Sequence, residues 1–171
     1  MKYAGIMPCS ISDGHGCRVV LFCSGCTIHC DECHNPLEQN PEYGKEFTEK
    51  TYETLYNLLN HDYIEGLTIS GGHPLEEFNK YKILDIIHWF KSKFPNKSIW
   101  LYTGLDLTID DWDGPYGGIL RLCDRIVDGH YDKTQRNITI PYRGSENQRI
   151  IDGIKTFACG EIVDVSVKYD N

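Results

Sequence analysis

Four cysteines stand within eleven residues near the start of the chain, in the stretch LFCSGCTIHCDECHNP. They are Cys23, Cys26, Cys30 and Cys33. Thiolates this close together can form disulfides, bind zinc or hold an iron-sulfur cluster. Structural zinc sites usually separate their two ligand pairs by roughly a dozen residues or more, whereas only three residues separate CSGC from CDEC. An iron-sulfur cluster is therefore the better match for this spacing.

The number of cysteine ligands decides between two kinds of iron-sulfur protein. If all four cysteines bind, every iron is capped and the chain is a ferredoxin-like electron carrier. If Cys23 belongs to the strand before it, Cys26, Cys30 and Cys33 form a CxxxCxxC motif and one iron stays open to a substrate. Cys23 directly continues the apolar run VVLF, where a cysteine usually behaves as a small buried hydrophobe. We therefore favour three ligands.

Composition narrows the class of partner and the compartment. The 171-residue chain has 17 Lys and Arg against 25 Asp and Glu, a net charge of -8, which argues against nucleic acid or an anionic membrane as the main partner. No run of about 18 apolar residues could span a bilayer, and MKYAGIMPCS lacks the apolar core of a signal peptide. We predict a single cytoplasmic domain over residues 1–171.

A reducing cytoplasm disfavours disulfides, so clustered cysteines there indicate metal binding or catalysis. The other four cysteines are scattered along the chain, and we expect each to be a reduced or buried bystander. They are Cys9, Cys17, Cys123 and Cys159.

The elements that must position the cluster alternate between strand and helix. Short β-branched runs predict strands, and apolar residues at helical spacing predict helices, with Thr48 as the N-cap of the first. The expected strands are 17–22, 66–70, 98–104 and 124–129, and the expected helices are 47–61, 76–94 and 116–123. In the tail we expect strands at 137–140 and 162–168, with a turn or short helix around 145–152. Such alternation predicts an α/β fold with a mostly parallel sheet.

The residues with chemical potential follow the ends of these strands. The cysteines follow the first strand, SGGHP follows the second, YTG ends the third and VDG ends the fourth. Because the carboxyl ends of parallel strands share one edge of a sheet, these four segments are expected to meet in one cleft.

The motifs of the chain resemble those of the radical S-adenosylmethionine enzymes, which carry CxxxCxxC and then a strand ending in a GGxPL motif. Within them the chain resembles the glycyl-radical activases, specifically the family that activates anaerobic ribonucleoside-triphosphate reductase. The stretches that carry the resemblance are DGHGCR, LFCSGC, SGGHPL, WLYTG, RIVDG and RGSENQRIID. The resemblance implies a partial (β/α) barrel of the radical S-adenosylmethionine type.

The resemblance also implies a function. Cys26, Cys30 and Cys33 would hold a 4Fe-4S cluster that reductively cleaves S-adenosylmethionine, and the 5′-deoxyadenosyl radical would take a hydrogen atom from a glycine of the reductase. The implied partners are the large subunit of that reductase and an electron donor such as flavodoxin, and a homodimer is an open option. No catalytic side chain is implied beyond the cluster and the cofactor.

Contacts to S-adenosylmethionine are expected from two of these segments. The candidate residues are Glu32, His34, Asn35, Ser70, Gly71, Gly72 and His73. Adjacent glycines allow a backbone to approach a ligand closely. His73 stands where the family usually carries Glu or Asp, and we expect a neutral imidazole, since a cationic one would repel the ammonium group of the cofactor. Glu32 stands where an aromatic residue is common.

Two further segments have open roles. Tyr102, Thr103 and Gly104 are expected to meet the cofactor or simply to pack. Arg143, Asn147, Gln148 and Arg149 could bind the carboxylate of S-adenosylmethionine, the partner, or each other.

Two alternative functions remain beside the activase. One is a radical S-adenosylmethionine enzyme with a small-molecule substrate, and the other is the four-cysteine electron carrier. A large protein substrate is favoured because a partial barrel leaves one side open.

Overall fold

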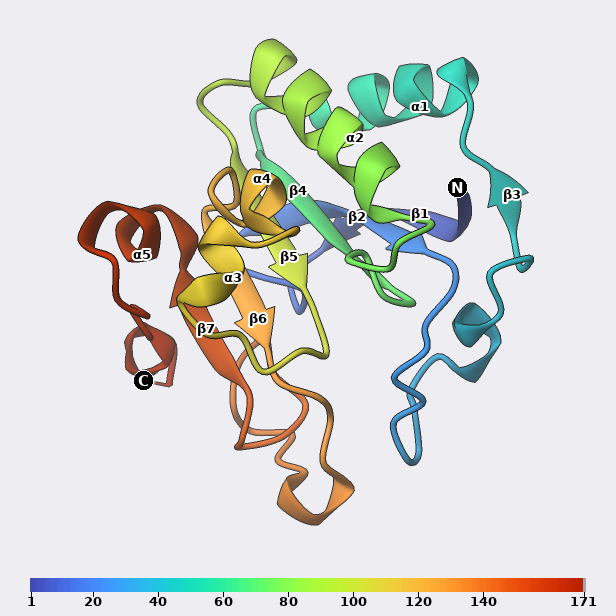
Figure 1. Ribbon diagram of the computed structural model, residues 1–171. Helices are drawn as coiled ribbons and strands as arrows, with labels where there is room; N and C mark the ends of the chain where they lie inside the picture. The colour runs from blue at the N-terminus through green and yellow to red at the C-terminus, as the bar shows by residue number, and fades with distance from the viewer. Residues whose placement is uncertain (171) are drawn as a thin grey trace.

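The computed structural model describes residues 1–170 and contains one seven-stranded mixed sheet (Figure 1). The strands are β1 (Lys2–Ser10), β2 (Cys17–Cys23), β3 (Lys45–Glu46), β4 (Ile64–Gly71), β5 (Ser98–Tyr102), β6 (Arg125–Asp128) and β7 (Arg149–Asp152). The helices are α1 (Glu49–Leu59), α2 (Lys80–Lys93), α3 (Asp110–Asp113), α4 (Gly117–Leu120) and α5 (Gly153–Cys159), with short 3-10 turns η1 (Pro36–Gln39), η2 (Lys133–Gln135) and η3 (Ser166–Lys168).

The centre of the sheet is parallel, as the alternation of strands and helices predicts. The strand order is β3-β1-β2-β4-β5-β6-β7. The strands β2, β4, β5 and β6 pair in parallel, whereas β1, β3 and β7 pair antiparallel with their neighbours. The α/β class is thus confirmed, while the barrel curvature stays a prediction. The carboxyl ends of the four parallel strands share one edge, which we call the rim.

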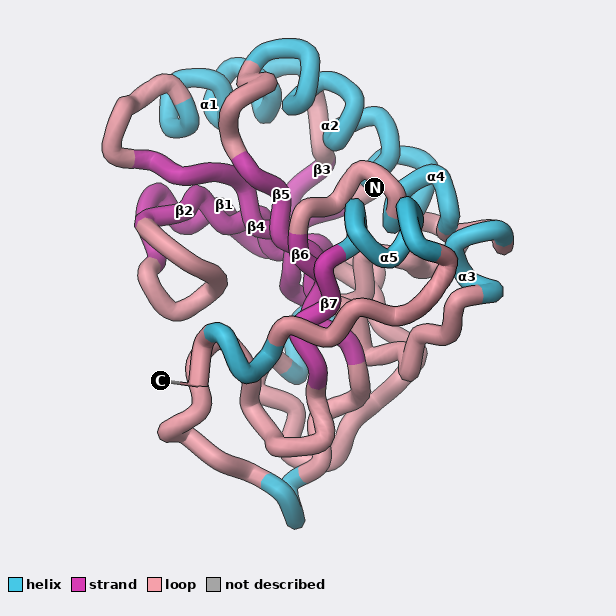
Figure 2. Tube along the Cα trace, turned by 90° about the vertical axis from the view of Figure 1, so that its left-hand side faces the viewer, coloured by secondary structure: helices cyan, strands magenta, loops and turns pink. Residues whose placement is uncertain are grey.

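The two long helices lie on one face of the sheet, and Figure 2 shows mostly loops on the other side of the strands. α1 begins after the predicted N-cap Thr48, whose backbone N–H donates to Thr51 Oγ1 at 3.1 Å. Leu55 and Leu59 of α1 and Ile86 of α2 are fully buried, because their helical spacing places them on the stripe that faces the strands.

Side chains of the central strands alternate between two cores. Ile99 and Leu101 of β5 join the larger cluster beneath α1 and α2. Trp100, between them, joins a smaller cluster on the opposite face with Val127 and Ile150. Because successive side chains point to opposite faces, the strand is buried on both, which explains its continuous apolar sequence.

A buried arginine ties the amino ends of the parallel strands together. Arg18, from the DGHGCR stretch, is fully buried. It donates from Nε to Thr68 Oγ1 at 2.8 Å and from Nη2 to the carbonyl oxygens of Leu67 at 2.9 Å and Ser98 at 2.8 Å. Burial lowers its pKa to about 10. This part of the family motif therefore stabilises the sheet at the edge opposite the rim.

The tail differs from the sequence prediction in three places. Residues 149–152 form β7 instead of a turn or helix, and residues 137–140 lie in turns instead of a strand. Residues 162–168, also predicted as a strand, contribute one isolated bridge at Asp164 and the turn η3. β1 and α5 were also not predicted from the sequence. For β1 and β7, pairing with a neighbouring strand decided the outcome, and local sequence patterns do not encode such pairing.

The cysteine prediction needs a correction outside the clustered motif. Cys9 and Cys17 form a disulfide, with Cα atoms 5.5 Å apart. The antiparallel pairing of β1 with β2 brings them together, as the register of Ser10 with Arg18 shows. Cys123 is free and buried and Cys159 is free and exposed, so both agree with the expected reduced or buried bystanders. Among the described residues, the helices are too short or too polar to cross a lipid bilayer.

Candidate metal centre and cofactor cavity

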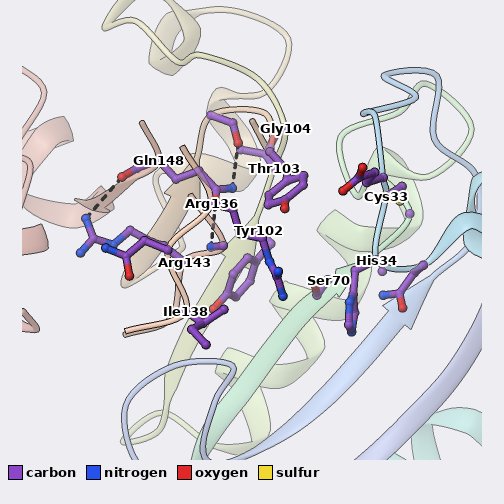
Figure 3. Close-up of a pocket in the computed structure, with 18 residues that line it drawn as sticks. Cys33, His34, Ser70, Tyr102, Thr103, Gly104, Arg136, Ile138, Arg143 and Gln148 are labelled. Atoms are coloured by element: carbon purple, nitrogen blue, oxygen red, sulfur yellow. Dashed lines mark hydrogen bonds between the residues drawn. The ribbon is translucent and has the colours of Figure 1, made fainter. Parts of the chain in front are cut away.

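A cavity of about 670 Å³ opens at the rim (Figure 3). The ends of β4 and β5, the loop after β2 and the long loop between β6 and β7 form its walls. Four segments far apart in sequence therefore meet there, as the strand ends predict. Its lining residues include Cys33, Tyr102, Thr103, Gly104, Gly129, Arg143 and Gln148.

The candidate cofactor contacts gather at this cavity with one exception. It is lined by Glu32, His34, Asn35, Ser70, Gly71 and Gly72. His73 does not line it and lies just behind the wall, where only 4% of its surface is exposed. Tyr102, Thr103 and Gly104 also line the cavity, so the third strand end contributes to its wall.

The three candidate ligands share one loop. Cys26, Cys30 and Cys33 are free and half-buried on the segment between β2 and η1, and Cys33 lines the cavity. The loop bends sharply, with positive φ angles of 51° at His29 and 55° at Glu32. Within residues 1–170, no three metal-ligating side chains converge on one point. The donor chemistry nevertheless fits an iron-sulfur cluster, because three free thiols lie on one short loop beside a cavity.

Cys23 is separate from these three. It ends β2, is fully buried and has a free thiol, as the apolar run before it predicts. Burial strongly raises the pKa of this thiol, so it stays protonated. A protonated thiol is a poor metal ligand.

The paired glycines bring β4 against the cysteine loop. A Cβ on Gly71 would lie 2.5 Å from the carbonyl oxygen of Cys23, and one on Gly72 would lie 2.6 Å from that of Gly25. The backbone N–H groups of Gly72 and His73 donate to these same two oxygens, at 2.7 and 2.8 Å. Close approach, expected toward a ligand, is thus also used to hold the cysteine loop in place.

His73 sits in a buried polar environment. Its Nε2 lies 2.8 Å from Thr103 Oγ1, and its Nδ1 lies 3.4 Å from Glu76 Oε1. Burial lowers the pKa of His73, although Glu76 opposes the effect. The lowered pKa agrees with the expected neutral imidazole. The ring, however, contacts side chains of the protein behind the cavity wall and does not line the cavity.

The polar tail segment binds both itself and distant parts of the chain. Gln148 Oε1 accepts from the backbone N–H of Gly144 at 2.8 Å, and its Nε2 donates to the carbonyl of Gly129 at 3.0 Å. Arg143 pairs with Asp170 and donates to the carbonyl of Gln148. Contacts of these residues with each other are therefore present, as one of the three expected uses. Arg143 and Gln148 also line the cavity, so contact with a ligand there stays a prediction.

Arg149 does not line the cavity and pairs with a buried carboxylate. Its Nε donates to Asp128 Oδ1 at 3.0 Å, and its Nη2 donates to the carbonyl of Leu107 at 2.8 Å. Asp128 is the aspartate of VDG and is fully buried. This pair joins the last residue of β6 to the first residue of β7.

Comparison with known proteins decides the family. Residues 12–151 match the family described as a 4Fe-4S single cluster domain. The anaerobic ribonucleoside-triphosphate reductase-activating protein of Enterobacteria phage T4 is 40% identical over 150 residues, or 88% of this chain and 93% of that protein. Proteins of the same name from Haemophilus influenzae and Escherichia coli are 34% and 32% identical, over 88% and 86% of this chain and 97% and 96% of their own lengths. This chain belongs to the family of anaerobic ribonucleoside-triphosphate reductase-activating proteins.

The family resemblance inferred from the motifs is confirmed. One part of the cavity lining, however, was not predicted from the sequence. The loop between β6 and β7 supplies Tyr131, Arg136, Asn137 and Ile138 to its lining. Figure 3 shows Arg136 in the middle of the site, between the wall with Gln148 and the wall with His34. The signal that could have found this loop is its position directly after VDG, the fourth strand end.

Proposed function

We propose that this chain is a radical-generating activase. At a 4Fe-4S cluster held by Cys26, Cys30 and Cys33, it would reductively cleave S-adenosylmethionine and use the resulting 5′-deoxyadenosyl radical to form a glycyl radical on anaerobic ribonucleoside-triphosphate reductase. The observation that carries the proposal is the placement of the cysteine loop and the glycine turn on one cavity. The names of the relatives support the reductase as the partner.

The residues of the chain would hold and shield the cofactor. Cys26, Cys30 and Cys33 would ligate the cluster, which supplies the electron when bound. Ser70, Gly71 and Gly72 offer backbone polar groups at the end of β4, and a carbonyl oxygen there can accept from the ammonium group of S-adenosylmethionine. His34 and Asn35, on the facing loop, are placed to border the rest of the ligand.

The number of ligands favours the activase over an electron carrier. Cys23 is fully buried at the end of a strand that pairs with β4, whereas the other three cysteines are half-buried on the loop that follows. Three ligands leave one iron without a protein ligand, and S-adenosylmethionine would bind there. An electron carrier needs no such position and no adjoining cavity.

Matched cysteine variants test the proposal. After anaerobic reconstitution, Cys26→Ala should lose the visible absorbance of the cluster, whereas Cys23→Ala should keep it. The wild-type protein and Cys23→Ala, once reduced, should convert S-adenosylmethionine to methionine and 5′-deoxyadenosine, and the EPR spectrum of the reductase should then show a glycyl radical.

The opposite results are equally clear. Loss of the cluster in Cys23→Ala, with no response of the wild-type EPR signal to S-adenosylmethionine, would leave the electron carrier as the better reading. Cleavage of S-adenosylmethionine without any radical on the reductase would instead favour a small-molecule substrate.

A further inference from the structure

A chain of four side chains connects the cavity wall to the cysteine loop. Thr103 ends this chain at the wall, and its Oγ1 lies 2.8 Å from Nε2 of His73. Nδ1 of His73 lies 3.4 Å from Glu76 Oε1. The same carboxylate oxygen accepts from the backbone N–H of Thr27 at 2.8 Å and from its Oγ1–H at 2.7 Å. Thr27 directly follows the candidate ligand Cys26.

The hydrogen-bond donors and acceptors of this chain are mutually consistent. A neutral imidazole carries one proton, and placing it on Nδ1 lets His73 donate to Glu76 and accept from the hydroxyl of Thr103. Oγ1 of Thr103 in turn accepts from the backbone N–H of Leu105 at 3.2 Å. With a neutral imidazole and an ionised Glu76, this arrangement of protons gives each of these contacts one donor and one acceptor.

Three of the four side chains in this chain of hydrogen bonds are largely buried, which increases the contribution of their contacts to stability. His73 and Thr103 are 4% and 5% exposed, and the side chain of Glu76 is 13% exposed. A polar group left without a partner in such surroundings is destabilising. The cysteine loop has few other side-chain ties, one being His29 Nδ1 to Gln39 Oε1 at 2.9 Å on an exposed stretch. The backbone N–H of Cys26 also donates to the carbonyl of Gln39 at 3.0 Å, and Lys133 pairs with Asp31 further along the loop. Glu76 is the side chain that binds the residue next to Cys26.

We propose that His73 and Glu76 form a positioning bridge that sets the Cys26 end of the cysteine loop relative to the cofactor cavity. Neither residue lines the cavity, so they act through Thr27 on one side and Thr103 on the other. This inference rests on the proposed function for its consequence in S-adenosylmethionine binding, while the bridge itself is a property of the protein alone.

The neighbouring glutamate provides a matched control. Glu77 follows Glu76, its side chain is 77% exposed, and its carboxylate pairs with Lys80, whose side chain is 8% exposed. Glu76→Ala removes the acceptor for Thr27, whereas Glu77→Ala removes the same side chain one position away. Glu76→Gln keeps an acceptor oxygen and should restore most of the wild-type behaviour.

Hydrogen exchange and ligand affinity give separate readouts. In anaerobically reconstituted protein, Glu76→Ala should speed amide exchange over residues 26–33 and weaken S-adenosylmethionine binding, each by about ten-fold, the ratio for roughly 1.4 kcal/mol. Glu77→Ala should stay within about two-fold of wild type in both. Because Thr27→Val keeps the backbone donor, it should fall between them, and it replaces Glu76→Ala if that variant does not fold.

The outcomes separate the bridge from the function. Equal exchange in Glu76→Ala and Glu77→Ala, or equal exchange in Thr27→Val and wild type when Glu76→Ala does not fold, would overturn the bridge. If wild type does not bind S-adenosylmethionine but the exchange difference is present, the bridge stands and the proposed function fails. If exchange changes while affinity for S-adenosylmethionine does not, the positioning role in cofactor binding is wrong.

Discussion

At the scale of single residues, burial separates cysteines that the sequence places side by side. Only two residues lie between Cys23 and Cys26 in CSGC, yet Cys23 is fully buried and Cys26 is half-buried on the loop. The apolar run before Cys23 was enough to predict this. The same reasoning failed for Cys9 and Cys17, because their disulfide depends on the pairing of two strands.

Glu38 is a buried carboxyl group that should make stability depend on pH. It lies on η1, and its Oε2 is buried with no hydrogen-bond partner among the described residues. Burial raises the pKa of Glu38 from 4.5 to about 7. The folded state therefore binds the proton more tightly, so this group's stabilising contribution is complete below about pH 4.5 and is lost as the pH rises through 7.

Replacing this carboxyl group tests the direction. Glu38→Gln should raise Tm more at about pH 8 than at about pH 5, because only the higher pH forces a buried charge in the original side chain. Thermal unfolding of the reconstituted protein measures the difference. Glu53→Gln, on the exposed side of α1, serves as the control and should shift Tm equally at both values. The same shift for Glu38→Gln at both values would contradict the buried charge.

At the scale of elements, the central strands and long helices were predictable and the tail was not. The runs of β2, β4 and β5 are buried on both faces, and α2 has a regular apolar stripe, so local sequence was sufficient. β7 contains Arg149 and Asp152 beside two isoleucines, a pattern that local propensity does not assign to a strand. It becomes a strand because it pairs antiparallel with β6 and because Arg149 meets buried Asp128.

The Arg149 pair should therefore contribute strongly to stability. Arg149→Met leaves Asp128 buried without its cation and should lower the free energy of unfolding by about 3 kcal/mol. Denaturant unfolding measures this loss. Arg136→Met is the matched control from the preceding loop, since that exposed guanidinium has no ion pair within residues 1–170, and it should change stability by less than about 0.5 kcal/mol. Equal effects of the two substitutions would show that the pair is not the stabilising feature.

At the scale of the whole molecule, the candidate cofactor residues lie around one cavity at the rim, and the β6–β7 loop forms part of its wall. Ile138 is 82% exposed although it borders the cavity, and Arg136 beside it is exposed as well. An exposed apolar side chain next to an unpaired cation suits contact with another protein. Under the proposed function, we expect the glycine-bearing segment of the reductase to contact this loop.

Substitutions in the β6–β7 loop should separate activation from cofactor cleavage. Ile138→Asp should reduce glycyl-radical formation on the reductase by about ten-fold, or roughly 1.4 kcal/mol, while cleavage of S-adenosylmethionine without the reductase stays near wild type. EPR and product analysis measure the two quantities. The control is Ile11→Asp, which is 77% exposed but lies before β2, at the edge opposite the rim. A parallel loss of cleavage and activation in Ile138→Asp would place that residue at the cofactor instead.

The sequence by itself determined the family, the three candidate ligands, the buried Cys23 and the meeting of four strand ends at one rim. These follow from short motifs and from apolar runs, whose physical meaning is local. Tertiary structure decided the disulfide, the strand β7, the contacts of the RGSENQR segment with distant parts of the chain and the place of His73 behind the wall. Each of these depends on which distant side chain or backbone group lies within hydrogen-bonding or bonding distance, and only the packed sheet brings those groups together.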